Sequence, residues 1–78
     1  MPHFYFKLIN DLEVEDPEGK ELDSLAAARQ QAAAYARDMA AEEVRQGKVH
    51  LNHRIIIQDE DRQPLLTVRL RDAFAIHY

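Results

Sequence analysis

Residues 25–46, LAAARQQAAAYARDMAAEEVRQ, decide the fold, because they contain neither glycine nor proline and predict one long helix in an otherwise strand-like chain. Asp23 or Ser24 can accept hydrogen bonds from the first free amides of this helix, and Gly47 is expected to end it. The predicted apolar stripe, on a 3.6-residue period, comprises Leu25, Ala28, Ala32, Tyr35, Ala36 and Met39. Because the stripe is mostly alanine, the helix can lie close to a sheet while burying little area per turn.

Two predicted strands precede the helix. Residues 3–9, HFYFKLI, are aromatic and β-branched in character, and alternate side chains point to opposite faces. A turn-forming pair at 10–11 leads to residues 12–15, where apolar and acidic side chains alternate as in a short, half-buried strand. The segment 16–19, DPEG, then interrupts the sheet, because proline fixes its φ angle and glycine admits positive φ. The first two strands should therefore form a hairpin.

Two further strands are predicted after the helix. Residues 54–58, RIIIQ, and 65–70, LLTVRL, have strand composition, and the polar run 59–63 joins them as a second hairpin. Beyond them, residues 73–78, AFAIHY, alternate small or polar with large side chains. We expect this tail to be strand-like or docked on the body of the protein.

These elements predict an α+β domain in the order ββαββ, with a four-stranded antiparallel sheet and one long helix packed on one face. A right-handed crossover through the helix places the first strand between the second and the third, which gives the spatial order 2-1-3-4. The side chains expected to face the helix as the core are Phe4, Phe6, Leu8, Leu12, Val14, Ile55, Ile57, Leu66, Val68 and Leu70.

Length and charge restrict the class of function. The chain has 78 residues, which predicts a single domain over residues 1–78. The net charge is −4, and the acidity is concentrated in residues 1–23, where seven acidic residues face two lysines. An acidic domain without a basic stretch argues against binding nucleic acid through its phosphates. The chain has no cysteine, no signal segment and no long apolar run. We therefore expect a cytoplasmic protein with no membrane association.

Several stretches together resemble one known family. They are the opening Met-Pro-x-Phe-Tyr-Phe-x-Leu at 1–8, the acidic turn ending in Glu-Gly at 18–19, Leu-Ala-Ala-Ala-Arg at 25–29, and the isoleucine and acidic pattern at 55–60 before Leu66-x-Val68. This set is similar to domain-of-unknown-function family 6894, a group of small bacterial proteins, over nearly the whole chain. The segment 61–64, DRQP, departs from the family, which often has a glycine in the last hairpin. The resemblance implies a domain identity and no activity.

His50 and His53 are the strongest candidates for metal ligands, because two neighbouring imidazoles can bind one zinc ion. They fall in a loop and at the start of a strand, so no helical spacing aligns them, and no third ligand is indicated. Solvated loop histidines are the simpler interpretation, and we predict no metal site. The acidic run 11–23 lacks the ligand spacing of a calcium-binding loop and is interpreted as a solvated sheet edge.

No catalytic or cofactor-binding residue is predicted. Ser24 is the only serine and suits a helix cap, while Thr67 lies in a strand. Gly19 and Gly47 are the only glycines, so the chain has no glycine-rich loop that could bind a phosphate. We therefore expect a protein that is not an enzyme and needs no cofactor.

One helix can cover only one face of the sheet, so the other face should be open and available for a partner. The candidate interaction face comprises Tyr5, Lys7, Ile9, Arg54, Ile56, Leu65, Arg69, Phe74, Ile76 and Tyr78. The leading hypothesis is a non-enzymatic protein-interaction module that forms a homodimer, or binds another protein, through this face. In the alternative arrangement the tail folds back over the same face. The competing functional hypothesis is a nucleic-acid-linked regulator, such as an acidic antitoxin-like partner protein.

Overall fold

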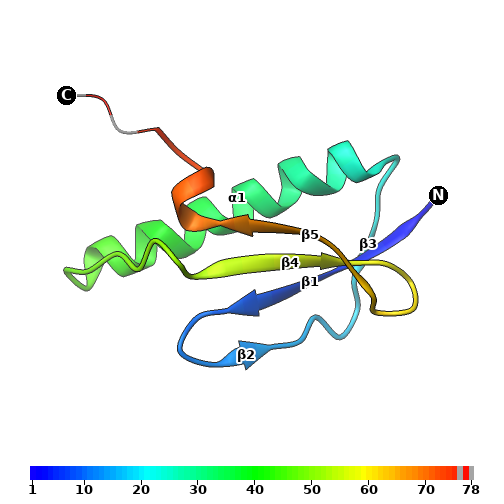
Figure 1. Ribbon diagram of the computed structural model, residues 1–78, viewed down its shortest axis with the longest axis horizontal. Helices are drawn as coiled ribbons and strands as arrows, with labels where there is room; N and C mark the ends of the chain where they lie inside the picture. Colours follow the sequence, from blue (N-terminus) through cyan, green and yellow to red (C-terminus); the bar gives the residue numbers. More distant parts are fainter. Residues whose placement is uncertain (76, 78) are drawn as a thin grey trace.

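The structure is a computed structural model that describes residues 1–75 and 77. It confirms the α+β class: one helix lies across one face of an open antiparallel sheet (Figure 1). The elements are β1 (His3–Ile9), β2 (Glu13–Val14), β3 (Lys20–Glu21), α1 (Leu25–Arg45), β4 (Arg54–Gln58), β5 (Pro64–Arg69) and the short 3-10 helix η1 (Leu70–Asp72). The main path of the sheet is β2-β1-β4-β5, which is the predicted spatial order.

The strand β3 was not predicted, and it pairs with the start of β1. It can do so because Gly19 adopts a φ of +69° and comes so close to β1 that a Cβ atom there would lie 2.5 Å from His3 Nε2. Between β2 and β3, a side chain takes the place of a neighbouring strand along β1. Asp16 Oδ2 accepts a hydrogen bond there from the Phe6 amide at 3.2 Å. The segment that was expected to interrupt the sheet therefore also extends it.

The helix begins and ends where the sequence predicts. Ser24 Oγ accepts a hydrogen bond from the Ala27 amide at 3.1 Å, and Gly47 takes a φ of +92° just after the C-cap Gln46. Four alanines of α1 are buried in the core, which is completed by side chains of β1, β4, β5 and η1. The buried residues of this core are Phe4, Phe6, Ala28, Ala32, Ala36, Ala40, Ile55, Ile57, Val68, Leu70 and Ala73.

Two residues predicted as core are exposed. Leu12 is 72% exposed and Val14, in β2, is 44% exposed. Val14 lies opposite Leu8 in the sheet and therefore on the helix side, but α1 packs over β4, β5 and η1 rather than over β2. Val14 therefore faces the side of the sheet that was predicted. The prediction that Leu12 and Val14 are buried is wrong, because the helix lies too far towards β5 to cover them.

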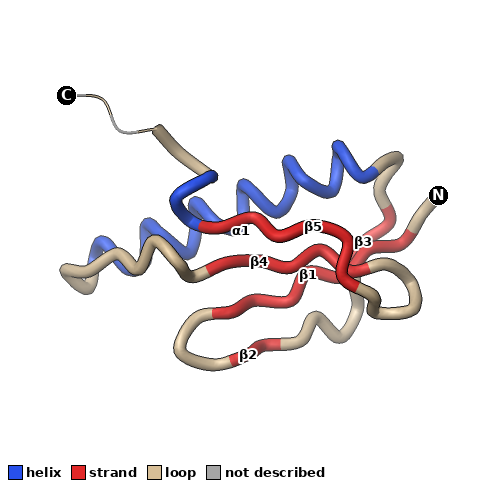
Figure 2. The backbone as a smooth tube through the Cα atoms, viewed as in Figure 1, coloured by secondary structure: helices blue, strands red, loops and turns tan. Residues whose placement is uncertain are grey.

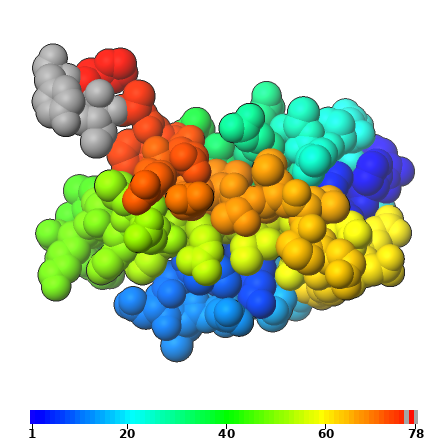
Figure 3. All heavy atoms as spheres, in the orientation of Figure 1, coloured from blue at the N-terminus to red at the C-terminus, as the bar shows by residue number. Residues whose placement is uncertain are grey.

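The tail differs from the expected strand-like segment. Ala73 is buried, and its carbonyl oxygen accepts a hydrogen bond from Arg37 Nε at 2.7 Å. Phe74 and Ala75 are exposed and form no strand, and in Figure 3 the coloured atoms at the red end of the chain lie at one corner of the molecule. The described part of the tail is therefore docked only at Ala73, while Ile76 and Tyr78 lie outside the described residues.

Candidate functional site

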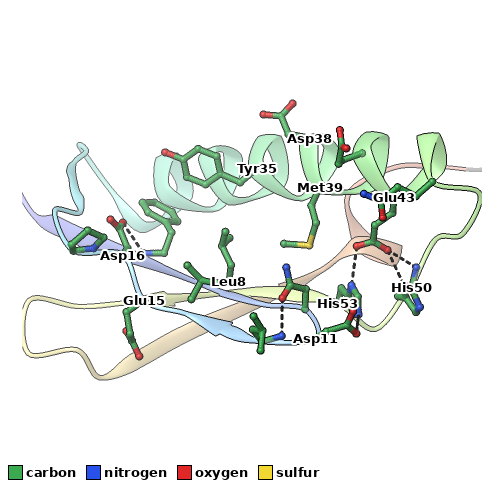
Figure 4. Close-up of a pocket in the computed structure, with 17 residues that line it drawn as sticks. Leu8, Asp11, Glu15, Asp16, Tyr35, Asp38, Met39, Glu43, His50 and His53 are labelled. Carbon is green, nitrogen blue, oxygen red and sulfur yellow. Dashed lines mark hydrogen bonds and ion pairs between the residues drawn. The ribbon is translucent and has the colours of Figure 1, made fainter.

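An open groove with a volume of about 830 Å³ lies between the second half of α1 and the β1–β2 hairpin. Figure 4 looks into it with the helix above and the sheet below. Its apolar lining residues are Phe6, Leu8, Leu12, Val14, Pro17, Tyr35 and Met39. The groove exists because α1 is displaced towards β5, so the apolar side chains near β2 have no helix above them.

Apart from two histidines, the charged side chains that line the groove are carboxylates, of which Glu15 is paired with Lys7 and Glu42 with Arg45. The carboxylates belong to Asp11, Glu15, Asp16, Asp38, Glu42 and Glu43. No lysine or arginine is among the described residues that line it. Acidic groups on the walls of an apolar hollow produce a negative potential that attracts cationic ligands. The groove therefore offers an apolar floor with an acidic rim.

One end of the groove holds a cluster formed by Glu43, His50 and His53, which we call the histidine cluster. Glu43 Oε2 lies 2.8 Å from His53 Nδ1, and Glu43 Oε1 lies 3.1 Å from His50 Nδ1 (Figure 4). The backbone amide of His50 also donates a hydrogen bond to Glu43 Oε1 at 2.7 Å. The two imidazole rings are stacked, with centroids 4.4 Å apart and planes inclined by 18°. Both rings thus direct a nitrogen at one carboxylate.

The reversal of the chain at Gly47 assembles this cluster. Glu43 lies four residues before Gly47 in the last turns of α1, and His50 lies three residues after it in the returning loop. The loop between β1 and β2 lies at the same end of the molecule (Figure 2), and it brings Asp11 Oδ1 to 3.7 Å from His53 Nε2. The sequence analysis did not include Glu43 among the candidate ligands. Its position four residues before Gly47, against three residues after it for His50, could have indicated that the two side chains meet.

The cluster is not the pair of solvated histidines expected from the sequence. The side chains of Glu43 and His53 are 13% and 15% exposed, whereas that of His50 is 49% exposed. Burial by itself raises the pKa of Glu43, but hydrogen bonds from the His50 amide, His53 and His50 outweigh it and hold the pKa below the ordinary value. Glu43 is therefore stabilised as a carboxylate.

The open face of the sheet is less apolar than predicted. Ile9 is buried, Ile56 is half-buried, and Leu65 is 44% exposed. Tyr5 is covered by the guanidinium of Arg62, which lies 3.6 Å from the ring centroid. Of the apolar residues Ile9, Ile56 and Leu65 in the predicted interaction face, only Leu65 and part of Ile56 are accessible.

Charges on this face are separated. Lys7 Nζ lies 3.2 Å from carboxylate oxygens of both Glu13 and Glu15. These neighbours, Glu15 first and then Glu13, raise the pKa of Lys7. Arg54 and Arg69 lie directly opposite each other on β4 and β5, and within the described chain neither forms an ion pair. One side of the open face is thus acidic and the other basic.

The fold and these sites define a small α+β domain with a one-sided helix layer and a ligand-sized acidic groove. The family model for the domain of unknown function DUF6894 matches residues 3–71, and the chain belongs to this family. No curated protein and no solved structure matches it. In the hairpin between β4 and β5, Arg62 adopts a φ of 65°. Among the described residues, no helix is long and apolar enough to cross a membrane.

Proposed function

We propose that this protein is a small, non-enzymatic interaction module whose groove binds a basic, partly apolar segment of another protein. The observation that carries the proposal is the combination of exposed apolar side chains, Leu12 and Val14, with six carboxylates and no lysine or arginine in the described lining. Burial of the apolar floor would supply affinity, and the acidic rim would select a cationic partner. A basic amphipathic helix has both properties.

The test uses two synthetic peptides and two matched variants. One peptide is an amphipathic helix with leucines on one face and lysines on the other, and its counterpart has glutamates in place of lysines. Val14 and Leu65 are each 44% exposed but lie on opposite faces of the sheet. Val14→Lys should reduce binding of the lysine peptide at least about tenfold, while Leu65→Lys should leave it unchanged.

Binding should also weaken as the salt concentration rises, because the attraction between the rim and the peptide is screened. Fluorescence anisotropy with labelled peptide measures both effects. Equal binding of the glutamate peptide, or binding that Val14→Lys leaves intact, contradicts the groove as the binding site.

A second candidate function is self-association through the open face, favoured by its separated charges. A two-fold axis brings the same patch of both copies together, so the acidic side, Glu13 and Glu15, could lie over the basic side, Arg54 and Arg69, of the other copy. Light scattering at micromolar concentration should then show a dimer for the full chain and a monomer for Ile56→Glu. A chain ending at Ala73 should remain dimeric, because it keeps the buried Ala73, and the exposed Phe74 and Ala75 form no strand on the sheet. A parent protein that is monomeric at every concentration removes this candidate.

The hypothesis of a nucleic-acid-linked regulator becomes more specific with the acidic groove. Such a regulator would hold a basic, nucleic-acid-acting protein in the groove rather than bind nucleic acid itself. A recurring adjacent gene for a small basic protein, and Val14-dependent binding of its product, would support this version. The absence of cysteine is compatible with a reducing compartment such as the cytoplasm, where we expect either form of the module to act.

A further inference from the structure

We infer that Glu43, His50 and His53 form a binding site for one divalent transition-metal ion, of which zinc is the natural probe. The inference shares Glu43 with the acidic lining of the groove, but it needs no peptide in the groove and no second copy of the chain. It rests on the ligand set, the distances between the ligand atoms and the position of Asp11 behind His53.

The ligand atoms have the right chemistry and nearly the right spacing. Two imidazole nitrogens and one carboxylate are a common protein ligand set for zinc, with zinc–nitrogen and zinc–oxygen distances of about 2.0–2.2 Å. A tetrahedral ion at these distances needs ligand atoms about 3.4 Å apart. One ligand atom from each residue of the histidine cluster lies within 4.8 Å of the other two. To bind one ion, the ligand atoms would have to approach one another by up to about 1.4 Å.

Zinc bound at Nδ1 requires the His53 tautomer with its proton on Nε2, and Asp11, outside the histidine cluster, favours this tautomer. A ligating histidine commonly donates its other ring N–H to a carboxylate, which orients the ring and increases its basicity as a ligand. His53 Nδ1 points to Glu43 and its Nε2 lies 3.7 Å from Asp11 Oδ1 (Figure 4). Zinc bound at Nδ1 would leave the single ring proton of neutral His53 on Nε2, which faces Asp11. Asp11 is thus a positioning residue rather than a ligand.

Three protein ligands leave one position of a tetrahedral ion free. The three residues are among those that line the groove, so this position is accessible from the groove to water or to a donor atom of a bound molecule. His50, with its half-exposed side chain, lies on the solvent side of the site, and Glu43 and His53 form its buried side. An ion can therefore enter without unfolding of the core.

The competing interpretation is a purely structural hydrogen-bond network in which Glu43 holds the loop between α1 and β4. It differs from the metal site in a measurable way, because a structural network gains nothing from added zinc. A site that binds zinc only in the folded state raises the melting temperature by mass action.

The experiment titrates the full metal-free chain with Zn²⁺ by calorimetry and repeats the binding with Co²⁺, whose visible absorption reports the ligand geometry. We expect one ion per chain, a tetrahedral cobalt spectrum and a higher melting temperature in excess zinc. His53→Gln and Glu43→Gln should abolish measurable binding. Asp11→Asn should weaken it less than the changes at Glu43 and His53 and leave the stoichiometry unchanged, because Asp11 lies 3.7 Å from His53 and its side chain is 90% exposed.

His77→Gln is the matched control, because His77 is exposed and outside the histidine cluster. It should bind zinc like the parent. Should Glu43→Gln fail to fold by circular dichroism, His50→Gln replaces it, since the half-exposed His50 side chain can be changed with little loss of packing. A parent melting temperature that is the same in excess zinc and in chelator overturns the inference. Binding that persists in both His50→Gln and His53→Gln also overturns it, because the ion would then be bound elsewhere.

Discussion

At the residue scale, Glu43 has the most consequential position in the chain. Its carboxylate accepts a hydrogen bond from the His50 amide and faces two imidazole nitrogens. It therefore holds the returning loop against the last turns of α1. A buried carboxylate is costly unless hydrogen bonds compensate for its lost hydration. The lowered pKa of Glu43 shows that here they more than compensate.

This pKa predicts how stability depends on pH. A group whose pKa is lower in the folded state stabilises the protein above its unfolded-state pKa, and the contribution is lost as pH falls through the folded value. For Glu43 the loss should therefore begin as the pH falls below about 4.5, the ordinary value for glutamate. In metal-free buffer, Glu43→Gln should cost roughly 1–2 kcal/mol at neutral pH, and the difference from the parent should shrink in acid.

Urea denaturation between neutral pH and pH 3 measures this difference. Glu60→Gln, at an exposed position of the hairpin between β4 and β5, provides the control and should follow the parent throughout. A constant gap between Glu43→Gln and the parent at all pH values would show that the charge of Glu43 has no part in the stabilisation.

The neighbours Tyr5 and Phe6 provide a second prediction, because alternation along β1 places them on opposite faces. Phe6 is buried and packs edge to face against Tyr35, with ring centroids 5.3 Å apart. Phe6→Ala should cost about 3–5 kcal/mol and leave so small a domain largely unfolded. Tyr5→Ala removes only a half-buried ring and its contact with Arg62, so it should cost much less. Thermal melts of both variants that rank them in the opposite order would contradict the assignment of the faces.

At the element scale, the edge of β1 is completed by two very short strands and one side chain. β2 and β3 have two residues each, and Asp16 bonds β1 between them. Such short strands have little stability of their own, so their positions depend on the connecting turn. In that turn Asp16 Oδ1 accepts a hydrogen bond from the Gly19 amide at 3.0 Å.

The two glycines test this dependence as a matched pair. Both adopt positive φ, where an L side chain costs about 1–2 kcal/mol. A Cβ at Gly19 would in addition lie 2.6 Å from the Phe4 carbonyl oxygen, whereas a Cβ at Gly47 meets nothing within 4 Å. Gly19→Ala should therefore be clearly more destabilising than Gly47→Ala, and it should increase hydrogen exchange at the start of β1. Equal melting temperatures for the two variants would mean that β3 contributes nothing to the fold.

At the scale of the whole molecule, the two proposed interaction surfaces lie on opposite sides of the sheet. The groove opens on the helix side, and the separated charges of Arg54, Arg69, Glu13 and Glu15 lie on the other. Glu15 lines the groove and also pairs with Lys7 on the open face, but Val14 and Ile56 lie on opposite faces and are expected to act independently.

Peptide binding should therefore leave the affinity of self-association unchanged, and the reverse. Val14→Lys should remove peptide binding without changing the oligomeric state, and Ile56→Glu should do the reverse. Light scattering with and without saturating lysine peptide measures the coupling directly. A change in oligomeric state on addition of peptide would show that the two faces communicate through the sheet.

Much of the architecture follows from local pattern. The long segment free of glycine and proline, with Ser24 before it and Gly47 after it, predicted α1 closely, and the strand at 54–58 was predicted with its observed bounds. The order of the four main strands followed from the handedness of the crossover. Periodicity also assigned Phe6 and Ile57 to the core, because alternation alone decides which face of a strand a residue occupies.

The groove, the exposure of Leu12 and the histidine cluster could not be predicted in the same way. Each depends on where the helix axis lies over the sheet and on how two loops meet at one end of the molecule, and neither is a periodic property of the chain. The sequence by itself determined the elements, their order and their apolar faces, because these depend on side-chain spacing and local backbone preference. Tertiary structure alone decided that α1 lies towards β5, that β2 is left uncovered, and that Glu43 and Asp11 approach His53. Those outcomes depend on the close packing of an alanine-rich helix against particular isoleucines, and packing is a property of surfaces that meet only in the folded protein.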